Sequence, residues 1–128
     1  MKPIDEISSD VIGVAMAIHR EIGPGLLESV YQAILAKKLT HLGYAVEIEK
    51  PLGFSFEDLE FPNAFKIDLL VDQSLVVELK SVERMQPVHS KQLLTYLRLM
   101  NLPVGLLINF GCETLKEGIK RVVNNHDR

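Results

Sequence analysis

Three ionisable side chains lie in or beside apolar segments where the chain reads KIDLLVDQSLVVELK, from position 66 to position 80. In the predicted strand LVVELK, Glu78 and Lys80 are two residues apart and therefore share one face. Asp68 belongs to the predicted strand before it. An unpaired charge inside a sheet costs roughly several kcal/mol, so such residues persist only when they are paired or functional. Two carboxylates beside a lysine suit metal-assisted cleavage of phosphodiesters.

Asp68 and Glu78 are sufficient as protein ligands, because magnesium prefers one or two carboxylates together with water and substrate oxygens. Adjacent strands lie about 4.8 Å apart, so an acid on each strand can reach one ion if the register allows. A cation there would polarise the scissile phosphate and lower the pKa of a bound water, and Lys80 would contact that water or the phosphate. The alternatives are a structural salt bridge between Glu78 and Lys80, or an edge strand with one face in water.

Two predicted helices carry further polar residues at helical spacing. Glu28 and Tyr31, in GLLESVY, share a helix face, where Glu28 could be a metal ligand or a base and Tyr31 could contact phosphate. The alternative is a first-turn glutamate that suits the helix dipole, next to a tyrosine that fills the core. Gln92 and Tyr96 are four residues apart in QLLTYL, where the glutamine could bind phosphate or a metal-bound water, or could simply be a surface residue.

The apolar pattern predicts three long helices that surround these residues, at about residues 7–22, 26–42 and 88–100. Ser8 or Ser9 is available to cap the first helix. The second helix is predicted to bury one side through apolar residues, which are Leu27, Val30, Ile34, Ala36 and Leu39.

Between the second and third helices the apolar period shifts toward two. The segment that begins at Tyr44 predicts a pair of short strands, with turns near Pro51-Leu52-Gly53 and near Glu57-Asp58. The strands of Asp68 and Glu78 follow, VGLLINF predicts another buried strand, and a short strand is expected at 119–123. This order indicates an α/β fold in which helices cover the faces of a mixed sheet.

The composition predicts one globular domain over residues 1–128, with 47% hydrophobic and 24% charged residues. No apolar run is long enough to span a bilayer and no signal-like segment stands at the N-terminus, so an intracellular, cytoplasmic protein is expected. A single cysteine, Cys112, excludes a disulfide framework and any multi-cysteine metal site, and the four histidines lack HExxH spacing.

The net charge of −3 argues against strong sequence-independent binding of nucleic acid over the whole surface. A local cationic patch could still engage phosphate. The candidates for such a patch are Lys37, Lys38, Lys66, Arg84, Lys91 and Arg98, and solvated helix faces explain most of them equally well.

Asp68 followed by Glu78-Leu79-Lys80 resembles the signature of the PD-(D/E)XK nuclease superfamily. The segment from Gln92 to Tyr96 is similar to the QxxxY motif of its RecB-like exonuclease branch, and GLLESVY is similar to the motif that names the GxxExxY proteins. The later blocks DLLV, VVELKSVE, QLLTYL, GLLINFG and GIKRVV resemble that group in order and spacing. One departure is Lys66, where the group commonly has an arginine, and lysine loses bidentate recognition of phosphate.

The resemblance implies a restriction-endonuclease-like domain with an αβββαβ core, and Mg²⁺- or Mn²⁺-dependent hydrolysis of phosphodiesters in nucleic acid, with DNA as the expected substrate and an exonuclease-like mode. It implies Asp68, Glu78 and Glu28 as metal ligands and Lys80 as the group that activates water or stabilises the transition state. Gln92 and Tyr96 would be accessory site residues. The superfamily also includes proteins that bind without cutting, so a catalytically inactive nucleic-acid- or protein-binding module remains open. A homodimer or a partner protein is compatible with the small size.

Overall fold

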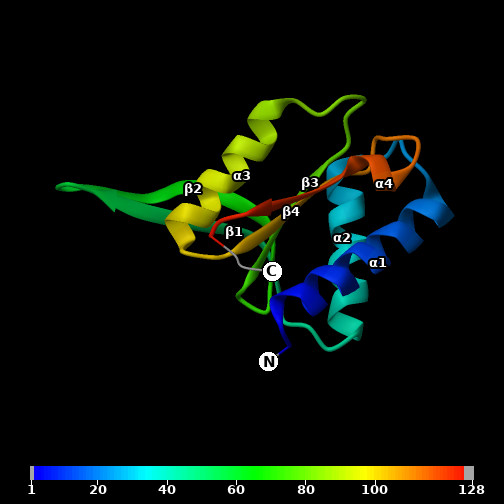
Figure 1. The fold of residues 1–128 in the computed structure, drawn as a ribbon, viewed down its shortest axis with the longest axis horizontal. Helices are drawn as coiled ribbons and strands as arrows, with labels where there is room; N and C mark the ends of the chain where they lie inside the picture. The colour runs from blue at the N-terminus through cyan, green and yellow to red at the C-terminus, as the bar shows by residue number, and fades with distance from the viewer. Residues whose placement is uncertain (1, 126–128) are drawn as a thin grey trace.

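The computed structural model describes residues 2–125 and contains nine helices and strands within them (Figure 1). The segment from α2 to β4 has the predicted order αβββαβ, so this expectation is confirmed; α1 precedes it, and α4 and β5 follow it. The elements are α1 (Ile4–Ile22), α2 (Glu28–His41), β1 (Val46–Phe56), β2 (Leu59–Val71), β3 (Leu75–Lys80), α3 (Pro87–Met100), β4 (Val104–Asn109), α4 (Leu115–Gly118) and β5 (Ile119–Val123).

The five strands form one mixed sheet in the order β1-β2-β3-β4-β5. Strands β3 and β4 are parallel, because α3 carries the chain back across the sheet, and the other neighbouring pairs are antiparallel. Figure 1 shows α3 on one face of the sheet and α1 and α2 on the other. A core cluster lies under each set of helices, and β3 and β4 contribute to both, which explains their nearly continuous apolar sequences.

The helices differ from the sequence prediction at their N-termini. Helix α1 begins at Ile4 after Pro3 and has no side-chain cap, so the capping role predicted for Ser8 or Ser9 is wrong. Helix α2 begins at Glu28, which leaves Leu27 73% exposed in the preceding loop and Val30 exposed. Ala36 and Leu39 are buried as predicted, and Tyr31 and Leu35 complete the buried face of α2 in place of Leu27 and Val30.

Strand β1 runs through Pro51 and Gly53 without a turn, so the turn predicted there is wrong. The pairing with β2 shifts between Leu52 and Phe54, which makes this site a β-bulge. A Cβ on Gly53 would lie 2.3 Å from the Phe61 carbonyl oxygen, so only glycine permits this close approach of the two strands. Proline has no backbone N–H to donate to a neighbouring strand. Pro51 is tolerated because β1 is an edge strand, which has a neighbour on one side only.

The short strands predicted from Tyr44 are wrong: β1 has 11 residues and β2 has 13, and β2 continues from Leu59 through Asp68 to Val71. The other strand and turn predictions are confirmed. The chain turns at Glu57-Asp58 and again at residues 72–74, and the short strand β5 occupies 119–123. The single-turn helix α4 before it was not predicted. Within residues 2–125, no helix combines the length and hydrophobicity that a membrane crossing would require.

Candidate active site

Asp68 on β2 and Glu78 on β3 lie on neighbouring strands, and each carboxylate accepts a hydrogen bond from a backbone N–H of the other strand. The Asp68 N–H donates to Glu78 Oε2 at 2.7 Å, and the Leu79 N–H donates to Asp68 Oδ2 at 2.8 Å. The backbone ladder between these strands ends one pair earlier, at Leu69 and Val77. The two carboxylates thus take the place of backbone acceptors where the strands separate, which fixes both side chains in position.

Both acids are shielded from water, and this burial raises the pKa of each carboxyl group. Burial raises the pKa of Glu78 from 4.5 to about 8, and the Asp68 carboxylate adds to the increase. Burial also raises the pKa of Asp68, although the Leu79 N–H and the Lys80 charge oppose the change. A buried and a half-buried carboxylate with raised pKa values, on neighbouring strands, are typical of a functional site rather than of a structural ion pair.

Lys80 lies half-buried at the end of β3, opposite Asn109 on β4. Its charge lowers the pKa of both acids, so the ammonium is within electrostatic range of them. Among the described residues, Lys80 takes part in no ion pair within 4.0 Å, so the structural salt bridge with Glu78 does not form. Strand β3 is central, so the edge-strand alternative is also wrong.

Gln92 and Tyr96 approach the acids from α3. The Tyr96 ring stacks on Phe65 of β2, with centroids 4.5 Å apart. Burial raises the pKa of Tyr96, the charges of Glu78 and Asp68 raise it further, and a hydrogen bond with the Gln92 side chain opposes them. The predicted pair therefore lies together and close enough to the carboxylates to sense their charge.

Glu28 is exposed in the first turn of α2. Its charge raises the pKa of both Asp68 and Glu78, yet within residues 2–125 no three acidic, histidine or cysteine side chains form a group that could hold a metal. Glu28 lines an open cleft of about 700 Å³ together with the loop before α2 and residues 81–83 that follow Lys80. The structure therefore places Glu28 at the border of the site and does not join it to the pair.

Tyr31 is a core residue, which confirms the alternative in which this tyrosine fills the core. It is fully buried and stacks on Phe110, with ring centroids 4.3 Å apart. Its hydroxyl donates to the Gly23 carbonyl oxygen at 2.6 Å and accepts from the Leu26 N–H at 3.2 Å. Tyr31 thus holds the loop that leads to Glu28 and is unavailable to phosphate.

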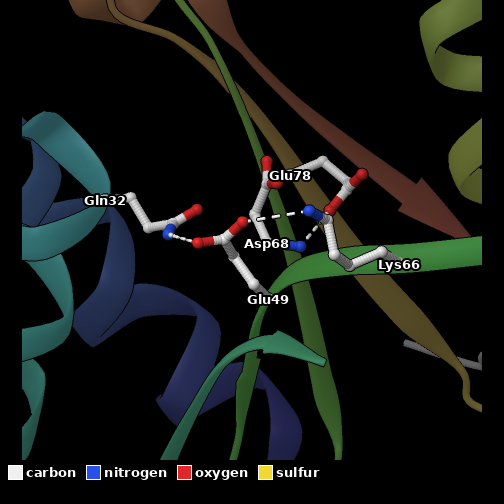
Figure 2. A network of polar contacts seen from close by, with 5 residues as sticks. All are labelled: Gln32, Glu49, Lys66, Asp68 and Glu78. Carbon is white, nitrogen blue, oxygen red and sulfur yellow. Dashed lines mark hydrogen bonds and ion pairs between the residues drawn. The ribbon is translucent and has the colours of Figure 1, made fainter. Parts of the chain in front are cut away.

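Glu49 on β1 is a third acid beside Asp68 that sequence reasoning missed. Figure 2 shows its carboxylate between Gln32 and Lys66, at 3.5 Å from Gln32 Nε2 and 3.0 Å from Lys66 Nζ. Its hydrogen bond with Lys66 lowers the pKa of Glu49, and its charge in turn raises the pKa of Asp68. The backbone of Glu49 has a φ of 48°, an uncommon conformation for a residue other than glycine.

Asn109 is the second residue that sequence reasoning missed. It is fully buried at the end of β4, and its amide clamps the segment after Lys80 through bonds with the N–H and carbonyl of Val82, at 3.0 and 2.9 Å. The same amide oxygen accepts from the Gly111 N–H at 2.9 Å. A Cβ on Gly111 would lie 2.2 Å from the Val82 carbonyl oxygen, so this close approach also requires glycine. The signal in the sequence was an asparagine inside an otherwise apolar strand.

The carboxylate pair fits a hard divalent cation. Each acid gives one oxygen to a backbone N–H, and within residues 2–125 no hydrogen bond or ion pair reaches the other oxygen, Asp68 Oδ1 or Glu78 Oε1. Burial raises both pKa values, and the charges of neighbouring carboxylates raise them further; a bound cation would relieve both unfavourable effects. Two carboxylates with water and substrate oxygens are the donor set that magnesium and manganese take.

We predict that Glu78 makes the metal-free protein less stable as the pH rises from about 5 to about 8. The folded state keeps a proton on Glu78 up to a pKa of about 8, whereas the unfolded chain releases it near 4.5. Between these values the folded state binds more protons, so the free energy of unfolding falls as the pH rises. Relative to Glu78→Gln, the wild type is expected to lose on the order of a few kcal/mol across this window.

Chemical denaturation of both proteins at several pH values measures this difference. Glu83→Gln removes an exposed carboxylate and controls for the loss of one charge. Parallel pH profiles for the wild type and Glu78→Gln would contradict the prediction.

The remaining sequence candidates lie elsewhere. His19 is buried and bonds through Nε2 to the Cys112 carbonyl oxygen at 2.9 Å, and His89 accepts from the Gln86 N–H at the start of α3. His126 lies outside the described residues. All six predicted cationic residues are exposed, but they are spread over α2, β2, α3 and the segment after β3. They do not form one patch around the acids, and Lys66 is paired with Glu49.

Comparison with protein families gives one match. A family model described as the PD-(D/E)XK nuclease superfamily matches residues 5–122 of the 128-residue chain. A search of curated proteins and a search of solved structures each find no match. The matched segment includes every predicted site residue and reaches from α1 into β5. The chain therefore belongs to the PD-(D/E)XK nuclease superfamily.

Proposed function

We propose that this chain is a divalent-metal-dependent nuclease whose centre is the Asp68–Glu78 pair. The observation that supports it most strongly is the reciprocal carboxylate geometry, with hydrogen bonds of 2.7 and 2.8 Å and a pKa of about 8 at Glu78. Membership of a nuclease superfamily supports a nucleic-acid substrate. We further propose that residues 1–128 form one domain, that DNA is cleaved in an exonuclease-like mode, and that the GLLESVY segment places the chain in the GxxExxY group.

In this proposal Asp68 and Glu78 hold Mg²⁺ or Mn²⁺ through their open oxygens. The bound cation supplies Lewis-acid polarisation of the phosphate and a more acidic water. Lys80, which is free of ion pairs among the described residues, carries a positive charge to the attacking water or to the phosphate oxygens.

The surrounding residues have positioning roles in the same proposal. Glu28 joins the site from the mouth of the cleft, where it orients a water or completes the metal's surroundings. Gln92 and Tyr96 orient water or phosphate from α3, since their side chains bond to each other beside the acids. Asn109 holds the segment after Lys80 through its bonds to Val82, and in this way it positions Lys80.

Isothermal titration of the protein with Mn²⁺ or Mg²⁺ tests the metal site. The wild type is expected to bind one ion per chain. Asp68→Ala is expected to weaken binding by at least tenfold, because it removes one of two charged ligands. Glu113→Ala, which removes an exposed acid, is the matched control and is expected to bind like the wild type. Equal affinity in Asp68→Ala and the wild type would remove the basis of the nuclease proposal.

A non-catalytic binding module on the same fold is the second candidate. The net charge of −3 and the dispersed cationic residues favour such a module with a protein partner, because both weaken attraction to the phosphates of a nucleic-acid substrate. Incubation with single- and double-stranded DNA and RNA in the presence of Mn²⁺ separates the two candidates. Cleavage that disappears in Glu78→Gln rejects the binding module, and intact substrates together with tight binding reject the nuclease.

A further inference from the structure

The outer part of the β1–β2 hairpin projects away from the rest of the molecule (Figure 1). Every residue of β2 from Leu59 to Ala64 is exposed, so this part of the hairpin packs on no helix. Its tip nevertheless carries large apolar side chains: Phe56 is 61% exposed and Leu59 is 59% exposed. Exposed apolar residues gathered at the end of a projecting ribbon are typical of an interaction surface.

The charge of this tip is entirely acidic. Residues 51–65 contain three acids and no lysine, arginine or histidine; the acids are Glu57, Asp58 and Glu60. A segment that engages nucleic acid would need positive charge near the phosphates, so the tip is a poor match for DNA or RNA. An apolar, acidic tip instead suits a protein surface that is apolar and basic.

The chain itself carries such a surface between α1 and α2. A groove of about 580 Å³ is lined by apolar residues from both helices and by three residues that are or can become cationic, and no acid lines it. Its residues are Val14, Ala17, Ile34, Lys37, Lys38, His41 and Leu42. Leu42 is 55% exposed there, which leaves apolar area uncovered in the isolated chain.

We propose that the tip of the β1–β2 hairpin of one copy, residues 56–61, inserts into the α1–α2 groove of a second copy. The apolar side chains Phe56 and Leu59 would cover the groove floor, and Glu57 and Asp58 would meet Lys37 and Lys38. Figure 1 shows the hairpin tip and the helices α1 and α2 at opposite ends of the molecule, so a chain cannot fill its own groove.

Each contact joins two different surfaces, the tip of one copy and the groove of the other, and a twofold axis that repeats this contact makes the whole interface isologous. Two such contacts related by a twofold axis close a dimer in which each copy gives its hairpin and receives its partner's. The proposal rests on the hairpin and the groove alone, and it stands whether or not the carboxylate pair cleaves nucleic acid.

Sedimentation velocity of the full chain, from about 10 to about 200 μM protein and at about 50 and about 500 mM salt, measures the association. Wild type is expected to form dimers that weaken as salt rises. Three variants are each expected to raise the dissociation constant by about tenfold or more: the tip double variant Glu57→Lys with Asp58→Lys, the groove double variant Lys37→Glu with Lys38→Glu, and Phe56→Ser. Lys116→Glu with Lys120→Glu, at two exposed lysines outside the groove, is the control and is expected to leave association unchanged.

Mixing the tip and groove double variants provides a rescue. Neither associates with itself in this proposal, but in the mixture each reversed surface meets an opposite charge on the other chain, so a heterodimer is expected. The proposal would be overturned if the wild type is monomeric at every concentration, or if the tip and groove variants associate as strongly as the wild type. Titration of a fluorescent oligonucleotide completes the test: a monomeric protein whose affinity for it falls in Phe56→Ser would overturn the proposal and assign the tip to nucleic acid.

Discussion

Replacement of Glu78 by glutamine is expected to remove metal-dependent cleavage and, above about pH 8, to make the metal-free protein more stable. The buried carboxylate is unfavourable when charged, and an amide of the same shape can still accept the 2.7 Å bond from the Asp68 N–H. Catalysis depends on the charge that the amide lacks, so the cleavage rate is expected to fall by about a thousandfold or more. Rates under single-turnover conditions and free energies of unfolding measure the two effects.

The same pair of proteins separates a metal ligand from a structural acid. Saturating Mn²⁺ is expected to raise the stability of the wild type, because a ligand that binds only the folded state stabilises it, and to leave Glu78→Gln unchanged. Thermal denaturation with and without Mn²⁺ records this difference. An equal gain in both proteins, or an active Glu78→Gln, would show that Glu78 is not the metal ligand.

Asn109→Ala is expected to cause the largest loss of stability, about 3–5 kcal/mol. The substitution empties a fully buried side-chain position and leaves three backbone groups of half-buried residues without their partner, namely the N–H and carbonyl of Val82 and the N–H of Gly111. Each such group costs about 1–3 kcal/mol when its partner is removed. A fall in melting temperature of roughly 10 °C or more follows for a chain of this size.

Asn124→Ala is the matched control for this prediction. The Asn124 amide also donates to backbone carbonyls, to Leu102 at 3.0 Å and to Leu97 at 3.4 Å, but the residue is only half-buried. Water can replace those bonds, so a loss of about 1 kcal/mol is expected. If the two variants lose equal stability, Asn109 does not clamp the segment after Lys80 in the way that its geometry indicates.

The sequence predicted well the features that depend on local pattern. The stretches at 7–22, 26–42 and 88–100 bury one face each, and that periodicity identified α1, α2 and α3. The prediction failed for the buried face of α2, where contacts with distant residues decide: Tyr31 stacks on Phe110 and is buried, whereas Val30 is exposed.

The neighbour of Asp68 on β1 shows what local pattern could not supply. Counted from the turn, with Phe56 opposite Leu59, an unbroken ladder would place Glu47 opposite Asp68. The bulge near Gly53 shifts the register, so that Ile48 pairs with Leu69 and Glu49 lies beside Asp68 instead. A bulge depends on the close approach of two strands and leaves no periodic signal in the sequence.

The sequence alone indicated the chemistry that we propose for this protein, because charged residues in apolar strands are costly and therefore informative. Asp68, Glu78 and Lys80 were identifiable from residue type and spacing, as were the α/β order and the helical pair Gln92 and Tyr96. Only the tertiary structure decided that each acid accepts a hydrogen bond from a backbone N–H of the other's strand, that Lys80 forms no ion pair with them among the described residues, and that Glu28 stays at the border. Those outcomes depend on distances between segments far apart in the chain, which are set by packing of the whole core and not by any stretch of sequence.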